Sequence, residues 1–317
     1  MQEERQPTRS FWFQSGDVVL HAENTQFRVH CKMLSHHSNV FKAMFGMPQF
    51  GFESYADDEV FVDGCPVVPL SDKAADVEHM LSVFYDNSKT HWESQMDIDH
   101  FSAVLRLGKK YEIELFTKEA LRRVRSDYPA TLDAWDQRGV YREEVKIVWE
   151  EAFVDALIKF INLAHELSVP SILPAAYFLY VHLTPLRSVV EEKRLCSQDR
   201  LHCILGRAEV LDFIRHRLKE WHEHEVLTAG EDCSSPAACG ALRLETVENE
   251  YFYLWKGFDI DYTPLESLGD PLSEFCLGCR NSIQNRYDEN RAQLWKKLPT
   301  FFGLPEWQEL QQLDFDR

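Results

Sequence analysis

The chain has 317 residues, of which 44% are hydrophobic and 13% aromatic, enough for two domains of ordinary size with buried cores. Its formal net charge is -18, from 34 basic and 52 acidic residues, and such a surface disfavours nucleic-acid and membrane binding. The eight cysteines come without a secretory signal or a membrane-spanning run, so we expect free thiols or metal ligands and a cytoplasmic or nuclear protein.

The N-terminal part predicts a flexible polar tail over residues 1–10, followed by two strands and a helix. The strands are Val18–Leu20 and Phe27–His30, joined by a turn at Glu23-Asn24. From Met33 to Phe45 the apolar residues recur at helical spacing, so one helix with an apolar face is expected.

The same stretch carries a dense set of residues with a known pattern: Asp-Val, a turn, Phe-x-Val-His, then Leu, Ser, Val-Phe and Met-Phe. The matching residues are Asp17, Val18, Phe27, Val29, His30, Leu34, Ser38, Val40, Phe41, Met44 and Phe45. The stretch resembles the opening of a BTB/POZ domain, and the alternative is a generic strand–strand–helix unit. The resemblance implies a small sheet flanked by helices, with Asp17 and His30 as a structural pair.

Further elements extend the resemblance to residues 11–128. Val60–Val62 and Val67–Leu70 are predicted strands, and Val77–Tyr85, Phe101–Tyr111 and Leu115–Val124 are predicted helices with apolar stripes. The last of these helices is expected to end at Tyr128-Pro129, because the residue before proline avoids helical geometry.

Residues 129–317 are predicted to form a mostly α-helical C-terminal domain. The expected helices are 153–167, 171–183, 201–221 and 272–298, with the last stopped by Pro299 and a loop at 231–240. An aromatic tail follows that we expect to fold back onto the helices. The pattern resembles a fungal, basidiomycete-like group of BTB proteins with a helical C-terminal region, through Trp295, Leu298, Pro299, Phe302, Leu304, Pro305 and Trp307. The fold class is therefore α+β, an N-terminal BTB/POZ fold followed by a helical domain.

Cysteine spacing supplies the best candidate for chemistry. Cys276 and Cys279 form a C-x-x-C pair with glycine before the second cysteine, which suits the turn of a zinc knuckle. Cys233 and Cys239, in the loop, are candidates for the other two ligands of one structural zinc ion. The alternative is that Cys276 and Cys279 are buried thiols on one helical face.

Other patterns give no catalytic site. His222-Glu223-His224 and His165-Glu166 lack the second histidine of a H-E-x-x-H motif, and no nucleotide-binding or nucleophile-elbow motif is present. We therefore expect no enzyme. The rival reading is a metal-dependent enzyme or regulator with its site in the C-terminal half.

The expected function is protein–protein interaction, through self-association or partner docking. The resemblance also implies, as an alternative, a substrate adaptor of a cullin–RING ubiquitin ligase. The family's hydrophobic-x-Glu motif is not met in register, because Gly51 occupies the hydrophobic slot before Glu53. The candidate partner-binding residues are Phe50, Phe52, Glu53 and Tyr55. Expected partners are proteins, either a second copy or a cullin, without nucleic acid or membrane.

Overall fold

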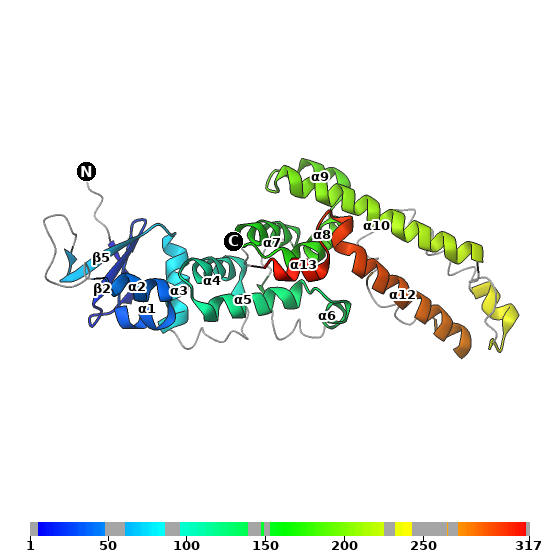
Figure 1. Cartoon of the computed structure of the whole chain (residues 1–317), viewed down its shortest axis with the longest axis horizontal. Helices are drawn as coiled ribbons and strands as arrows, with labels where there is room; N and C mark the ends of the chain where they lie inside the picture. Colours follow the sequence, from blue (N-terminus) through cyan, green and yellow to red (C-terminus); the bar gives the residue numbers. More distant parts are fainter. Residues whose placement is uncertain are drawn as a thin grey trace. The chain divides into compact units, whose positions relative to one another are not determined.

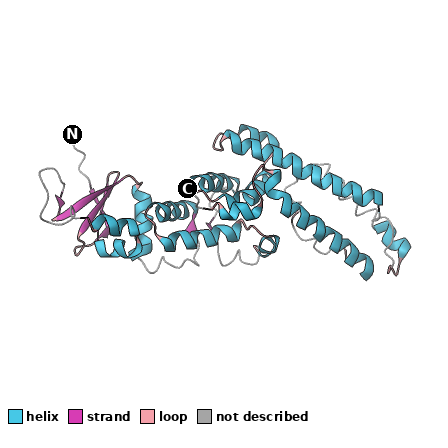
Figure 2. Cartoon of the chain, viewed as in Figure 1, coloured by secondary structure: helices cyan, strands magenta, loops and turns pink. Residues whose placement is uncertain are grey.

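The computed structural model describes residues 6–47, 61–85, 96–138, 147–148, 153–224, 232–242, 265 and 272–314. The chain divides into two compact units (Figure 1). The first unit comprises Met1–Val124 and Tyr141–Glu150, and the second comprises Arg125–Val140 and Glu151–Arg317. Among the described residues, every strand belongs to the first unit, and the second unit is built from helices (Figure 2). This arrangement confirms the expected α+β class.

A five-stranded sheet organises the first unit. Its strands lie in the order β1-β3-β2-β5-β4, with β2 antiparallel to β3, β2 parallel to β5, and β4 antiparallel to β5. The turn between β2 and β3 falls at Glu23-Asn24, as the sequence predicts, and Glu23 adopts a φ of 50° there. The strands are β1 (Gln6–Trp12), β2 (Val18–Ala22), β3 (Thr25–Val29), β4 (Phe61–Val62) and β5 (Cys65–Leu70).

Strand β1 begins inside the segment for which the sequence predicts a flexible tail. It pairs in parallel with β3, with Gln6 opposite Thr25 and Trp12 opposite Arg28, and the register shifts between these two pairs. The edge of β3 offers backbone donors and acceptors with which a largely polar segment can pair, and Phe11 near the end of β1 also enters the core. Polar composition alone therefore does not distinguish this edge strand from a tail.

The single helix predicted from Met33 to Phe45 is two helices, α1 (Cys31–His37) and α2 (Asn39–Phe45). Ser38 separates them in an extended conformation, and its hydroxyl accepts a hydrogen bond from the N–H of Phe41 at 3.0 Å. The same hydroxyl donates to the carbonyl of Tyr111. Ser38 thus caps the second helix and ties it to a residue far along the chain.

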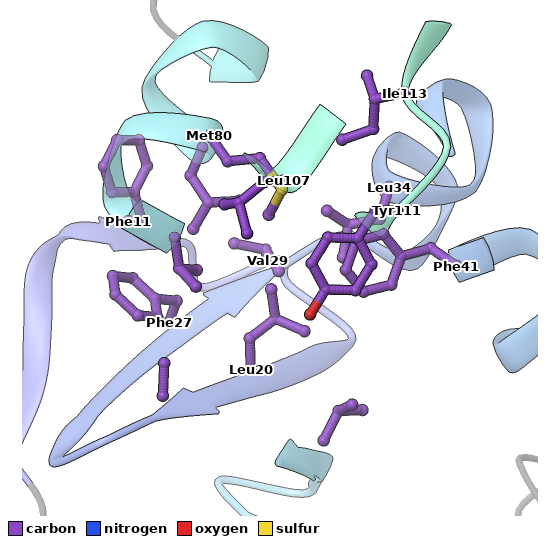
Figure 3. Close-up of a cluster of buried hydrophobic side chains, with 14 of the residues drawn as sticks. Phe11, Leu20, Phe27, Val29, Leu34, Phe41, Met80, Leu107, Tyr111 and Ile113 are labelled. Carbon is purple, nitrogen blue, oxygen red and sulfur yellow. The ribbon is translucent and has the colours of Figure 1, made fainter. Parts of the chain in front are cut away.

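The core of the first unit fills the space between the sheet and the helices (Figure 3). Alternate residues of β2 and β3 point into it, and the remaining side chains come from β1, β5, the helices α1 to α5 and the turn between α4 and α5. The labelled members in Figure 3 are Phe11, Leu20, Phe27, Val29, Leu34, Phe41, Met80, Leu107, Tyr111 and Ile113. Further elements of the unit are α3 (Ala74–Tyr85), β6 (Met96–Asp97), α4 (Ile98–Lys110), α5 (Glu114–Asp127) and β7 (Ile147–Val148).

The second unit packs its helices around α8, whose residues from Leu173 to His182 are all buried. Helices α7 and α10 both contact α8. This explains why α8 has apolar residues around its whole circumference. The described elements of this unit are α6 (Leu132–Gln137), α7 (Phe153–Leu167), η3 (Pro170–Ile172), α8 (Leu173–Leu183), α9 (Leu186–Glu191), α10 (Ser197–His224), a short helix at residues 236–242, α12 (Leu277–Phe301) and α13 (Trp307–Gln312).

Helix α12 differs from the predicted helix 272–298 at both ends. It begins at Leu277, after an extended Cys276, and it continues past Pro299 to Phe301. The missing N–H of Pro299 leaves the carbonyl of Trp295 without its helical donor, and Trp307 Nε1 donates to that carbonyl instead at 2.8 Å. The aromatic tail folds back as expected, and the ring of Trp307 stacks on Trp295 with centroids 5.1 Å apart.

Candidate metal centre

Two short stretches of the second unit carry the four cysteines that the sequence singles out. Cys233 lies in a loop just before a short helix at residues 236–242, and Cys239 lies within that helix. Cys276 is the N-cap of α12, and Cys279 is in its first turn. The structure brings the two stretches together (Figure 1, yellow and orange).

The four sulfur atoms form one compact group. All four Sγ atoms lie within 4.8 Å of one another, and the Sγ atoms of Cys233 and Cys276 are 3.7 Å apart. A tetrahedral ion with metal–sulfur bonds of about 2.3 Å needs sulfur–sulfur separations of about 3.8 Å. A disulfide needs about 2.05 Å, and all eight cysteines of the chain are free. The group is therefore spaced to hold a metal ion.

Two of the four cysteines are buried, so solvent reaches the sulfur group from one side. Cys239 and Cys279 are 1% and 0% exposed, while Cys233 and Cys276 are partly exposed. A small hydrophobic cluster surrounds the two buried thiols, formed by Leu272, Phe275 and Ile283 with Leu242 at its margin.

Backbone hydrogen bonds polarise the cysteine group. The N–H groups of Cys279 and Ser234 donate to Cys276 Sγ and lower the pKa of Cys276 to about 6. Burial raises the pKa of Cys233 to about 12, and its hydrogen bonds with the other three thiols add to this rise. The two partly exposed thiols thus differ in acidity, and a divalent cation would displace the proton that Cys233 holds more tightly.

Gly278 is essential to this geometry for a reason that the spacing does not reveal. The sequence suggests that it supplies a turn, but the residue lies within α12 and needs no positive φ. A Cβ at this position would lie 3.0 Å from the backbone oxygen of Asp232. The glycine therefore allows the loop that carries Cys233 to approach α12 closely.

The cysteine group lies at the N-terminal end of α12. Among the described residues, α10 does not extend far enough to pack against this end. Helices α10 and α12 run antiparallel: the rings of Phe213 and Phe301 are 5.8 Å apart, and Arg217 hydrogen-bonds to Gln293. His224, seven residues after Arg217, ends α10 and thus lies level with about Arg286. The first turns of α12 extend beyond this level and pack on residues 232–242.

A second polar cluster was missed by the sequence reasoning. Asp199 is 1% exposed and accepts hydrogen bonds from Tyr177, from Cys196 Sγ at 3.1 Å, and from His165 Nε2 at 2.7 Å. Burial raises the pKa of Asp199, but these three hydrogen bonds outweigh burial and lower it overall. The cluster joins α7, α8 and α10. In the sequence, the only indication of it is an aspartate at an apolar position of a predicted helix.

A comparison with protein families addresses the N-terminal unit. The sequence profile of the BTB/POZ domain family matches residues 8–125. Residues 8–125 are a BTB/POZ domain. This domain is a protein–protein interaction module. Comparisons with curated proteins and with solved structures returned no match. Within the described part of the chain, no helix has the length and apolar character needed to cross a membrane.

Asp17 and His30, which the resemblance pairs, hydrogen-bond to separate partners around the start of α1. The Asp17 carboxylate accepts the N–H of Cys31 at 2.7 Å. The His30 ring contacts Ser15 Oγ at 3.0 Å and the hydroxyl of Tyr85 at 3.2 Å. Each residue thus fixes the junction between β3 and α1, although through different hydrogen bonds.

Several other residues from the sequence analysis lie outside the described part of the structure. The candidate partner-binding residues Phe50, Phe52, Glu53 and Tyr55 are among them, so that assignment stays a prediction. The side chains of His222 and His224 are likewise outside it.

Proposed function

We propose that the chain is a non-enzymatic interaction protein whose BTB/POZ domain binds protein partners, with a second copy of the chain as the first candidate. The profile match over residues 8–125 carries this proposal. The described part of this unit also leaves large apolar side chains exposed, with Met47 at 51% and Leu115 at 52%. Such side chains are common at association surfaces, although single ones also occur on monomers.

Light scattering on the full chain over a range of concentrations tests self-association. A mass of two or more chains that persists on dilution to micromolar concentration supports the proposal. A mass of one chain at every concentration contradicts self-association, and docking to a different protein would then be the function to pursue.

The proposal also assigns a structural zinc ion to Cys233, Cys239, Cys276 and Cys279. An all-thiolate set suits a soft, tetrahedral ion, and four protein ligands leave no open position for substrate or water. A catalytic zinc site needs such a position, so the four-cysteine set favours a staple over the metal-dependent enzyme.

Cobalt(II) substitution tests this assignment without relying on activity. Cobalt bound by four thiolates gives strong visible absorption of tetrahedral type, which zinc should bleach on addition. Octahedral spectra, or thiolate bands that keep their full wild-type intensity in a Cys279→Ser variant, would contradict the four-cysteine site.

A further inference from the structure

The four cysteines of the metal centre differ in their access to solvent. Cys239 and Cys279 lie at 1% and 0% exposure within the small hydrophobic cluster. Cys233 and Cys276 are partly exposed, and they are the pair whose sulfur atoms lie 3.7 Å apart. One edge of the sulfur group therefore faces solvent, and the opposite edge is buried.

We propose that the Cys233–Cys276 edge is an oxidation site, at which a hydroperoxide forms a disulfide between these two residues and releases the metal ion. Cys239 and Cys279 are not oxidised, and each takes up a proton from water as the ion leaves. The inference rests on the proposed metal centre and goes beyond it, because it assigns different roles to its ligands.

The reaction needs one hydroperoxide for each chain. A thiolate of the exposed pair attacks one peroxide oxygen, the O–O bond breaks, and the products are a sulfenic acid and hydroxide or alkoxide. The thiolate of the other cysteine then attacks the sulfenic sulfur, forms the S–S bond and expels hydroxide. Two sulfurs lose two electrons in total and the peroxide gains them, while the divalent ion leaves as its aquo complex because only two ligands remain.

The positions of the cysteines favour this pair over the alternatives. Bond formation requires the sulfurs to move from 3.7 Å to about 2.05 Å. Cys233 lies in a loop, which can make that movement, whereas Cys279 is fixed in the first turn of α12. A peroxide also reaches Cys233 and Cys276 without opening the cluster of Leu272, Phe275 and Ile283.

The test treats the purified, zinc-loaded full chain with hydrogen peroxide and follows zinc release with a chromogenic chelator. Free thiols are then alkylated under denaturing conditions, and the disulfides are mapped by mass spectrometry. Zinc content is measured before the oxidant is added. The matched control is Cys196→Ser, which removes an exposed cysteine outside the metal centre.

Zinc release at the same rate as Cys233–Cys276 disulfide formation, with Cys239 and Cys279 alkylated, is the expected result, and Cys196→Ser should leave both rates unchanged. A dominant Cys276–Cys279 or Cys239–Cys279 disulfide overturns the inference, as does retention of zinc after the thiols have reacted. A chain that contains no zinc at the start contradicts the metal centre itself. In that case the disulfide map of the metal-free chain still shows whether the exposed pair reacts first.

Discussion

Removing one buried ligand of the metal centre should unfold the end of the second unit while leaving the rest folded. Cys279→Ser replaces a fully buried thiolate with a hydroxyl that binds zinc poorly. Residues 232–242 and the first turns of α12 then keep only the small cluster of Leu272, Phe275 and Ile283.

The size of this cluster sets the expected effect. Burying three large apolar side chains stabilises by about 1.5–3 kcal/mol each, or about 7 kcal/mol together. Ordering residues 232–242 costs about 1–2 kcal/mol per residue, or roughly 11–22 kcal/mol. The cluster therefore falls short of the ordering cost by about 4–15 kcal/mol, which the 10–16 kcal/mol or so that structural zinc supplies in small peptides can cover. Without the ion, the segment should therefore be largely unfolded.

Amide hydrogen exchange followed by mass spectrometry measures this local unfolding directly. In Cys279→Ser, and in the wild type after chelation, protection of residues 236–242 and the first three turns of α12 should fall by at least about 100-fold, or about 2.7 kcal/mol. Cys196→Ser should keep wild-type protection there. Unchanged exchange in these peptides after complete metal removal would refute the reasoning.

Three further predictions concern other parts of the chain. Asp199→Asn should destabilise the second unit by about 1.5–3 kcal/mol in denaturant unfolding, because Tyr177, His165 and Cys196 lose a buried, charged acceptor. The folded-state pKa of Asp199 is lowered, so its stabilisation is present above the usual aspartate range and is lost as pH falls through the folded-state value. Gly206→Ala should cost about 1–3 kcal/mol in thermal unfolding, because the new Cβ would overlap the buried ring of Phe302. Leu115→Asp should weaken self-association in light scattering at least tenfold, because it puts a charge on an exposed apolar side chain of α5 that we assign to the contact.

Each of these three predictions has a matched control variant or a result that would contradict it. Stability of the Asp199 variant that parallels the wild type at every pH would contradict the buried-acceptor argument. Gly240→Ala, where a Cβ meets nothing within 4 Å, should be nearly neutral, and an equal loss at both glycines would argue against the Phe302 overlap. Val190→Asp on α9 matches Leu115 in exposure at 53%, and it should leave the scattering mass unchanged.

Patterns that repeat along one element were readable from the sequence. The turn at Glu23-Asn24, the apolar stripes of the helices and the end of α7 before Pro170 all depend on neighbours within a few residues. The four-cysteine group could also be proposed, because Cys276 and Cys279 share a turn and thiols in two nearby segments can meet at one ion.

Features that depend on distant partners could not be read in this way. Ser38 breaks a helix because its hydroxyl reaches the carbonyl of Tyr111, and nothing near Ser38 indicates that contact. Position 278 needs a glycine because the backbone of Asp232 lies close to it, and not because the chain turns there. Similarly, β1 is a strand because the edge of β3 is available, although its first five residues are polar or proline.

Metal content and stoichiometry test the account most directly. Elemental analysis of the full chain, purified without chelator, should find one zinc ion per chain in the wild type and in Cys196→Ser, and much less than one in Cys276→Ser. A wild-type chain that contains no bound metal, or a Cys276→Ser variant that retains a full equivalent, would contradict the four-cysteine centre.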